Sequence, residues 1–331
     1  MAVIYSSIVF PFDPPIHRNF TTLPTCDHDH PPMFCSFGCQ PSTKSMPTNP
    51  TYILYDIPGT VTKHQSWSPN VWKTRYATII THTYEDDTCK RIVLNYKEIP
   101  HRTEWIEFPD IAEVAKRIGA PHTFMRRGGK PLYTVPIIRD PATDRCLSGS
   151  LQIALNLERL YPHSPKLFPP GTEDLITDFD DKFLRSVATA LVPLLLSRIW
   201  TQLGDGSKDY FRTTRERIFR GSLEMFSAPG TATAARWIAV REALEPFAKD
   251  ADARGASNTF LLGERETYAD VVAACWLNWA RRMWGANTQE WAALETWHGG
   301  RWGRLTRAFH KWEYVDTSAP DSAKCAFLFL D

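Results

Sequence analysis

A proline-rich stretch in the middle of the chain constrains the fold most. Residues 161–170 read YPHSPKLFPP and contain four prolines, so they can form neither a helix nor a central strand. Before this stretch, strand-like runs alternate with helical ones, and after it every segment has a helical pattern. A semi-stiff linker between two such patterns predicts two domains, at 46–160 and 171–331, joined by a linker at 161–170.

The first of these domains is expected to be a small α/β fold. Strands are predicted at 52–57, 103–108 and 133–138, with a fourth ending near Leu147, and helices at 68–76, 110–118 (capped by Asp110) and 150–161. Pro136 lies inside the third strand pattern, where it removes a ladder donor. A cis Val135–Pro136 bond would turn the strand there and expose the backbone of Val135 to a ligand.

The second domain is expected to be all-helical, with a bulky aromatic core. Most of the 12 tryptophans lie beyond residue 190. Helices are predicted at 177–203, 213–226, 231–252, 267–283 and 289–297. Pro193 and Pro246 are predicted to kink or split two of them. Thr267 followed by Asp270 ahead of an apolar run resembles a capping box.

Charge and composition exclude several classes of function. Lys+Arg 38 against Asp+Glu 37 leaves a net charge of +1, without the basic excess typical of nucleic-acid binding. The longest unbroken apolar runs, such as 190–196, fall short of the roughly 18 residues that span a membrane. The start of the chain lacks a basic leader, and seven scattered cysteines suit a reduced compartment. We therefore expect a cytoplasmic protein with neither a nucleic-acid nor a membrane partner.

Residues 1–45 differ from the rest because they are rich in proline and have no sustained period. They are predicted to be a disordered extension. Their thiols and imidazoles could ligate zinc; these residues are Cys26, His28, His30, Cys35 and Cys39. Only Cys35 and Cys39 have the spacing of one zinc-finger arm, and a matching second arm is missing. No metal site is therefore expected.

Six motifs resemble the cytosolic glutathione transferases, most closely the fungal-specific class A enzymes, which are related to the bacterial β-etherases. They are SWSPNVWKTR (66–75), LNYK (94–97), HRTEW (101–105), FPDI (108–111), YTVP (133–136) and DYFRTTRE (209–216). The resemblance implies a thioredoxin-like domain with a cis-proline, followed by an all-helical domain, in a homodimer. It also implies glutathione as a co-substrate, with no bound cofactor.

The resemblance implies that a serine activates the glutathione thiol. A free thiol is mostly protonated near neutral pH, and a hydroxyl donor at a helix start stabilises the thiolate. Ser68 has the N-cap position before Pro69, Asn70 could add an amide donor, and Ser66 could compete for the role. The alternative is that Ser68 only caps a helix. No cysteine occurs between residues 40 and 88, which argues against a thiol transferase.

The resemblance also implies where the rest of glutathione binds. Its cysteinyl backbone would pair with Val135, next to Pro136, like an added strand. Ser150 and the amides of its helix would hold the γ-glutamyl carboxylate. The family usually has an acid one residue earlier, whereas this chain has Gly149. We expect the loss of that contact to weaken binding by roughly 1.5–3 kcal/mol.

The expected reaction is attack of glutathione on small aromatic electrophiles or aryl ethers. The candidate acceptor-site residues are Trp67, Tyr210 and Phe211. The alternative for each is packing in the core. Trp72 is a further candidate, but core packing is favoured for it because it falls inside a predicted helix. Two other functions remain open. One is a non-catalytic protein that binds aromatic ligands, and the other is an inactive family member.

A second departure from the family is residues 78–93, which separate the TRYA and LNYK motifs that the family has joined. The segment is rich in β-branched residues and would split the helix that carries Ser68. A retained intron would explain it, and a functional surface loop is the alternative. Five of its residues could in principle bind a metal: His82, Glu85, Asp86, Asp87 and Cys89. A solvated acidic loop is favoured over a metal site.

Overall fold

The computed structural model describes residues 51–60, 66–75, 99, 101–126, 128–310 and 313. The predicted extension at 1–45 and the segment at 78–93 lie outside these residues, as do both sets of candidate metal ligands. The predictions made for these two segments therefore stay predictions.

The N-terminal domain is built on a four-stranded mixed sheet with strand order β2-β1-β5-β6. Its strands are β1 (Tyr52–Asp56), β2 (His101–Trp105), β5 (Ile137–Asp140) and β6 (Arg145–Ser148). Strands β1 and β2 are parallel, and the other two pairs are antiparallel. Every residue of β1 is buried, as a central strand covered on both faces requires.

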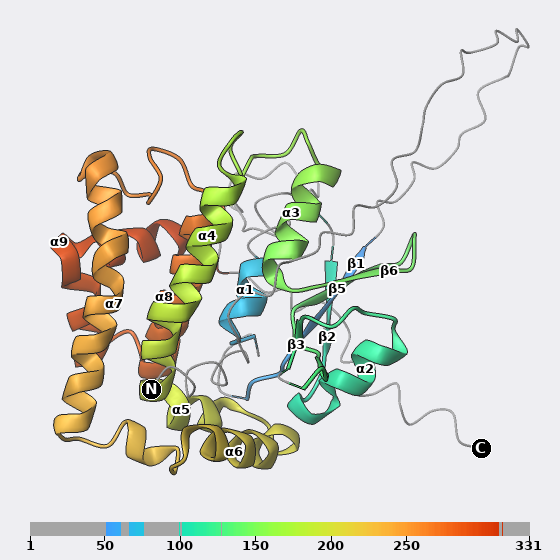
Figure 1. Cartoon of the computed structure of the whole chain (residues 1–331), viewed down its shortest axis with the longest axis horizontal. Helices are drawn as coiled ribbons and strands as arrows, with labels where there is room; N and C mark the ends of the chain where they lie inside the picture. The colour runs from blue at the N-terminus through green and yellow to red at the C-terminus, as the bar shows by residue number, and fades with distance from the viewer. Residues whose placement is uncertain are drawn as a thin grey trace, which may run out of the picture.

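Helices cover both faces of this sheet (Figure 1). α1 (Pro69–Arg75) and α3 (Ser150–Leu160) lie between the sheet and the helical domain, and α2 (Ile111–Arg117) lies on the far side. α1 and α3 also pack against each other. This arrangement confirms the predicted thioredoxin-like α/β domain.

Three local predictions in this domain were wrong. The third strand begins only at Ile137, because the cis Val135–Pro136 bond turns the chain before it. The second strand ends at Trp105, and the chain continues into the 3₁₀ turn η2 (Phe108–Asp110). Asp110 does not cap α2 with its side chain, because its backbone is already helical. The short hairpin of β3 (Phe124–Met125) and β4 (Pro131–Leu132) was not predicted.

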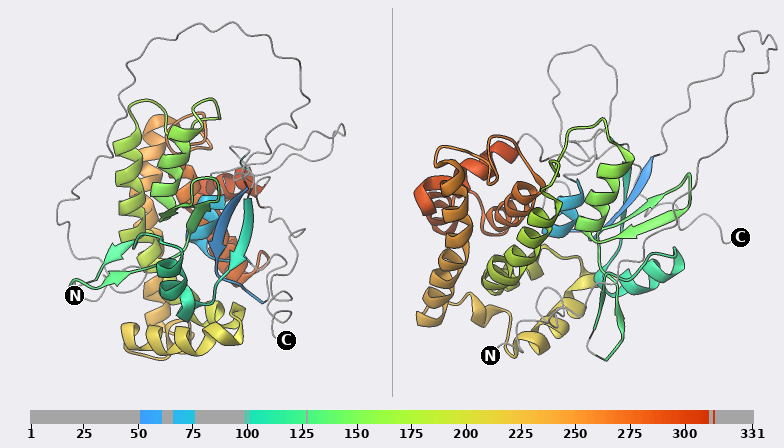
Figure 2. Two further views of the ribbon diagram at one scale, coloured as in Figure 1. Left: turned by 90° about the vertical axis from the view of Figure 1, so that its right-hand side faces the viewer. Right: turned by 45° about the horizontal axis from the view of Figure 1, so that its top comes forward.

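The C-terminal domain is helical throughout, as predicted. Its elements are α4 (Glu173–Phe183), the π turn η3 (Leu184–Ala188), α5 (Thr189–Gln202), α6 (Asp205–Phe219), η4 (Glu224–Phe226), α7 (Thr231–Gly255), α8 (Tyr268–Trp284) and α9 (Gln289–Phe309). Figure 2 shows this domain beside the sheet domain in two further views. Neither Pro193 nor Pro246 splits its helix. The capping box of Thr267 and Asp270 is confirmed.

Two helices differ most in extent from the predictions. α6 begins at Asp205, eight residues before the predicted start at 213, and ends earlier than predicted. α9 continues to Phe309 after a break in helical geometry that includes His298, Gly299 and Gly300. The predicted helix ended at Trp297, where this break begins.

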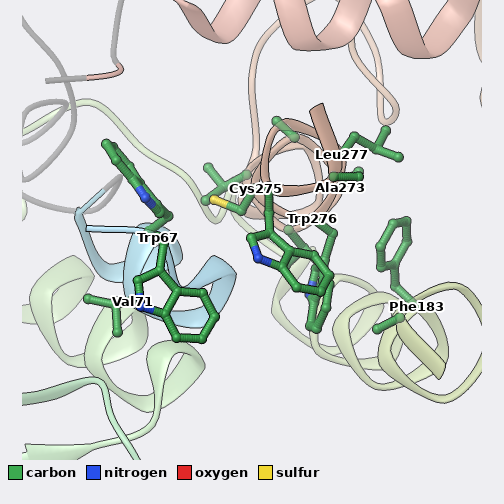
Figure 3. Close-up of a cluster of buried hydrophobic side chains, with 14 of the residues drawn as sticks. Trp67, Val71, Phe183, Ala273, Cys275, Trp276 and Leu277 are labelled. Carbon is green, nitrogen blue, oxygen red and sulfur yellow. The ribbon is translucent and has the colours of Figure 1, made fainter. Parts of the chain in front are cut away.

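The two domains share one hydrophobic core centred on α8, which is buried along most of its length. In the view of Figure 3, Trp67, which lies just before α1, is seen between Val71 of α1 and Trp276 of α8, and all three belong to this core. Phe183 of α4 lies farther along on the other side of Trp276. Helix α1 therefore joins the sheet domain to the helical domain, and Ser68 lies directly at its start.

The helical run Glu173–Gln202 is long and apolar enough, by length and composition, to cross a membrane. Looking only for unbroken apolar runs missed it. Half of its most apolar window is buried inside the protein, and α5 packs against α7 and α8. In this fold the run serves as a core helix of the helical domain.

Candidate functional site

A cavity of about 570 Å³ lies between the two domains. The sheet domain contributes the start of α1, the turn η2 and the cis-proline segment, and the helical domain contributes α5, α6 and α8. Such a volume suits a small organic ligand. The predicted site residues that line it are Trp67, Ser68, Asn70, Val135, Tyr210 and Phe211.

Ser68 lies at the cavity with its hydroxyl unused by the described part of the chain. Its carbonyl accepts the first helical hydrogen bond, 3.0 Å from the Trp72 amide nitrogen, so the residue starts α1. The side chain is buried, 7% exposed, and lines the cavity beside Asn70. The Oδ1 atom of Asn70 is also buried without a donor. Both polar groups are therefore available to a ligand.

Ser66, the competing serine, is held elsewhere. Its Oγ donates to Asp56 Oδ2 over 2.7 Å and accepts from Arg75 Nε over 3.1 Å. Arg75 also bonds Asp56 and Thr103. All of Ser66, Asp56 and Arg75 are buried, and Ser66 is not among the described residues that line the cavity. Ser66 therefore does not reach the cavity that Ser68 lines.

The cis-proline segment forms the opposite wall. The Val135–Pro136 peptide bond is cis, as predicted, and Val135 lines the cavity. The Gly149 amide donates to the Pro136 carbonyl over 3.0 Å, which places the start of α3 and Ser150 next to this wall. Pro136, Gly149 and Ser150 do not themselves line the cavity as the structure describes it.

Gly149 has an unusual backbone, with φ 88° and ψ 127°. L-residues rarely adopt this conformation, whereas glycine does so at no steric cost. The residue was singled out because it replaces an acid, and its backbone geometry supplies a second reason for glycine at this position.

The aromatic wall of the cavity is organised around Phe108. Its ring lies 6.0 Å from that of Trp67, 5.8 Å from that of Phe211 and 6.4 Å from that of Tyr210, with which it is stacked. The three acceptor-site candidates thus come together through one residue that the sequence analysis did not select. Phe108 belongs to the FPDI motif, but only the fold brings η2 against α6.

Trp276 and Trp279 of α8 also line the cavity. Their rings meet edge to face, 5.2 Å apart. The indole N–H group of each is buried and has no acceptor among the described residues. These donors are unsatisfied polar groups in the wall, which protein interiors rarely keep.

The site carries a positive charge that was not predicted. Arg126, Arg215 and Arg217 line the cavity, and no acidic residue does among the described lining residues. Arg215 lies over two aromatic rings, 5.5 Å from the centre of Phe108 and 4.9 Å from that of Phe211. Burial, with a smaller contribution from Arg126, lowers the pKa of Arg215 to about 10. Its guanidinium is therefore still charged at neutral pH.

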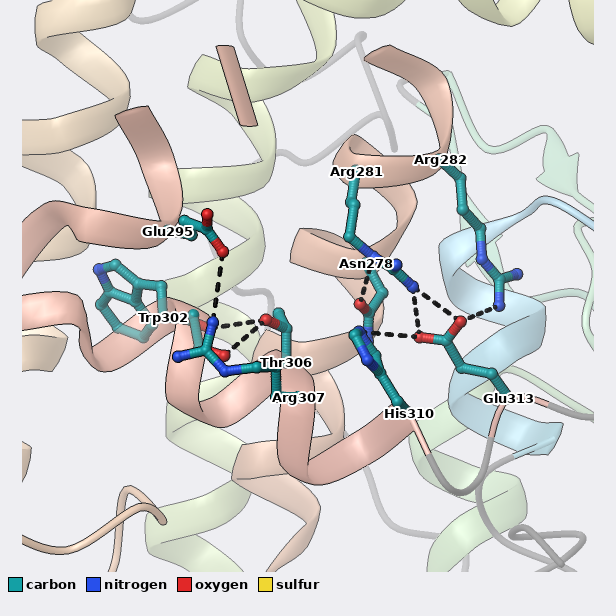
Figure 4. A network of polar contacts seen from close by, with 10 residues as sticks. Asn278, Arg281, Arg282, Glu295, Trp302, Thr306, Arg307, His310 and Glu313 are labelled. Atoms are coloured by element: carbon teal, nitrogen blue, oxygen red, sulfur yellow. Dashed lines mark hydrogen bonds and ion pairs between the residues drawn. The ribbon is translucent and has the colours of Figure 1, made fainter. Parts of the chain in front are cut away.

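Trp72, for which packing was favoured, lies behind the site. Arg282 covers its ring at 4.1 Å. Glu313 accepts hydrogen bonds from Arg282 and Arg281, a network drawn in Figure 4. The network ties the residues after α9 to the helix that follows Ser68. Among the residues described, no group of three or more His, Cys, Asp or Glu side chains could hold a metal ion.

Comparisons with known proteins point to one family. The family model described as "Glutathione S-transferase, C-terminal domain" matches residues 175–312. A crystal structure of a glutathione S-transferase from Ceriporiopsis subvermispora, in complex with glutathione, is 37% identical over 81% of this chain and all of that one, with a TM-score of 0.73. Glutathione transferase GSTFuA3 from Phanerochaete chrysosporium is 34% identical over the same shares, with a TM-score of 0.72.

A curated protein gives the same indication. The glutathione S-transferase-like protein ustS of Aspergillus flavus is 29% identical over 281 residues. The match covers 82% of this chain and 92% of that protein.

Proposed function

The chain belongs to the cytosolic glutathione transferase superfamily, and from this premise we propose that it is a serine-type transferase that uses glutathione on small aromatic electrophiles. The observation that carries the proposal is the Ser68 hydroxyl, which lines an aromatic cavity and makes no hydrogen bond within the described structure.

Ser68 supports thiol activation by hydrogen bonding. A hydroxyl that donates to sulfur favours the thiolate over the thiol and so lowers the thiol pKa. The released proton goes to solvent, and the Asn70 amide adds a second polar contact. The thiolate then attacks an electron-poor carbon of the acceptor. A C–S bond forms, and the bond to the leaving group, a halide or an aryl-ether oxygen, breaks with its electron pair.

The cis-proline segment supports a pose for the rest of glutathione. The backbone N–H and C=O of Val135 would pair with the cysteinyl residue as an added strand does. Ser150 and the first amides of α3, which has eleven residues, would receive the γ-glutamyl carboxylate. Because Gly149 brings no acid to this end of the ligand, glutathione should bind more weakly here than in a relative with an acid, by roughly one to two decades.

The aromatic wall supports an aromatic acceptor. Trp67, Phe108 and Tyr210 offer ring faces at spacings typical of aromatic packing.

We extend the proposal to a cytoplasmic homodimer, as the sequence resemblance implies. Sedimentation equilibrium tests the dimer.

The proposal is tested by two measurements on the full chain. Calorimetry should show saturable glutathione binding, and an activated aryl halide should be consumed only when glutathione is present. Aromatic ligand affinity without turnover would instead make the protein a ligand-binding one. If the full chain neither bound glutathione nor turned over the aryl halide, it would be an inactive family member.

A further inference from the structure

Arg215 is a cation with no anionic partner among the residues that the structure describes. Among the described residues its side chain donates one hydrogen bond, from Nη1 to Thr214 Oγ1 over 3.0 Å. No ion pair joins it to an acid within the described residues. A guanidinium has five N–H donors in a planar fork. Most of these donors are therefore not used by the described protein, and the residue lines the cavity.

The surroundings of Arg215 make this lack of a partner costly. The side chain is partly buried, and its guanidinium lies over the rings of Phe108 and Phe211. Cation–π contact recovers less free energy than the desolvation of an unpaired charge costs. Arg126 and Arg217 add like charge to the same cavity. Neighbouring Arg212 on the same helix, in contrast, is paired with Glu216 and Glu224.

We propose that the aromatic acceptor of this enzyme carries a carboxylate, which pairs with the Arg215 guanidinium while its ring packs on Phe108 and Tyr210. The fork of Arg215 matches the two oxygens of a carboxylate. The guanidinium carbon lies 5.5 Å from the ring centre of Phe108 and 4.9 Å from that of Phe211, so an aromatic ring and its acid group can bind at adjacent positions. This inference rests on the proposed function, because it takes the cavity to be the acceptor site.

Glutathione is the other source of a carboxylate. The groups proposed to hold glutathione, at Ser68, Val135 and Ser150, all belong to the sheet domain. Arg215 belongs to α6 of the helical domain and rests on the aromatic wall. Arg126, next to the β3–β4 hairpin of the sheet domain, is on the same domain as the glutathione groups. The placement therefore assigns Arg215 to the acceptor.

A matched pair of electrophiles tests the assignment. 4-Chloro-3-nitrobenzoate and 4-chloro-3-nitrobenzamide have the same leaving group and nearly the same shape, but only the benzoate is an anion. Arg215→Gln should lower kcat/KM for the benzoate by about tenfold to a hundredfold, the effect of one charge-assisted hydrogen bond. The benzamide should change less than about threefold. Arg215→Lys, which keeps the charge without the fork, should lie between.

Binding measured without turnover separates this inference from the proposed function. The unreactive 3-nitrobenzoate and 3-nitrobenzamide can be titrated against tryptophan fluorescence, because Trp67, Trp276 and Trp279 line the cavity. If no electrophile is turned over but Arg215→Gln still weakens only the benzoate, the proposed reaction fails and the anion site stands. Arg212→Gln, which removes the same charge from α6 outside the cavity, should leave the ratio of benzoate to benzamide affinities unchanged.

Three outcomes would overturn the inference. Equal losses for benzoate and benzamide would mean that Arg215 only shapes the cavity. A weaker calorimetric affinity for glutathione in Arg215→Gln, with unchanged benzoate affinity, would assign the residue to glutathione. If Arg212→Gln showed the same selective loss of benzoate affinity, the effect would come from the overall charge of α6 and not from a contact with Arg215.

Discussion

The Ser66 hydroxyl donates a 2.7 Å hydrogen bond to Oδ2 of the Asp56 carboxylate, and both side chains are buried. Asp56 ends strand β1, and Ser66 lies just before α1. Arg75, in the last turn of α1, bonds both. The three residues thus fasten the strand to the helix. Ser68, only two residues after Ser66, has no such bond and lines the cavity.

This contrast predicts opposite effects for the two serine-to-alanine variants. Ser68→Ala should raise the pKa of the bound glutathione thiol toward that of a free thiol and slow conjugation at neutral pH about tenfold or more, with little change in unfolding free energy. Ser66→Ala should lower the unfolding free energy by about 1–3 kcal/mol, because a buried carboxylate loses a donor. Thiolate absorbance against pH and urea unfolding measure the two effects.

Each serine variant serves as the control for the other. Should Ser66→Ala raise the thiol pKa while Ser68→Ala leaves it unshifted, the catalytic assignment belongs to Ser66. If neither variant shifts it, no serine of this motif activates glutathione.

The fold was predictable where local chemistry determines it. Pro136 in a strand pattern indicated the cis turn, and Thr267 with Asp270 indicated the start of α8. The early start of α6 was not predictable, because residues 205–212 include Gly206 and are mostly polar. There, tertiary contact helps to hold the helix start: Ser207 Oγ accepts from the Phe108 amide and also donates to Glu107.

The site was predictable only where a motif carries it. Ser68, Asn70 and Val135 came from short motifs, and all three line one cavity. Phe108 and Arg215 lie in equally short motifs, but their roles depend on η2 packing against α6. The i, i+4 spacing of Phe211 and Arg215 was a usable signal, since such residues share a helix face.

Gly149 allows a prediction in which strain and charge are separated. Both Gly149→Ala and Gly149→Asp must adopt φ 88°, so each should lose about 1–3 kcal/mol of unfolding free energy. Space is not the obstacle, because a Cβ there would meet Thr123 Cγ2 at an ordinary 3.4 Å. Only Gly149→Asp adds an acid at this position, so Gly149→Asp should bind glutathione more tightly than Gly149→Ala does.

Urea unfolding and calorimetric titration of both Gly149 variants test this. Equal glutathione affinities in the two would show that an acid at this position does not reach the ligand. Unchanged stability in both would show that the helix start relaxes to another backbone conformation.

Asp270 predicts a pH dependence of stability. Burial raises the pKa of Asp270 from 3.8 to about 6, although it accepts bonds from Leu261 and Thr267. The folded protein therefore binds this proton more tightly than the unfolded chain. The resulting stabilisation is complete below pH 3.8 and is lost as the pH rises through about 6.

Asp270→Asn removes this titration and keeps most of the side-chain shape. The unfolding free energy of the native protein minus that of Asp270→Asn should therefore fall by about 1.4 kcal/mol between about pH 5 and 8. Urea unfolding at several pH values measures it. Parallel pH curves for the native protein and Asp270→Asn would contradict the raised pKa of Asp270.

The last prediction concerns the ion pair that joins the two domains behind the site. Lys73 Nζ of α1 lies 2.9 Å from Asp180 Oδ1 of α4, and the two side chains are 1% and 9% exposed. Removing one partner of a buried pair leaves an uncompensated charge, which costs about 3–5 kcal/mol. Replacing both with apolar residues of similar size removes the charges together, and the result is often close to neutral.

Lys73→Met and Asp180→Leu should therefore each destabilise the protein strongly, whereas the double variant should recover most of the loss. Urea unfolding of the four proteins gives the coupling free energy between the two residues. Because Asn70 and Lys73 share the short helix α1, each single variant should also slow conjugation, and the double variant should restore it. Losses that simply add in the double variant would show that the two residues do not stabilise the fold as a pair, and that other contacts, such as Arg282 over the Trp72 ring, hold α1 against the helical domain.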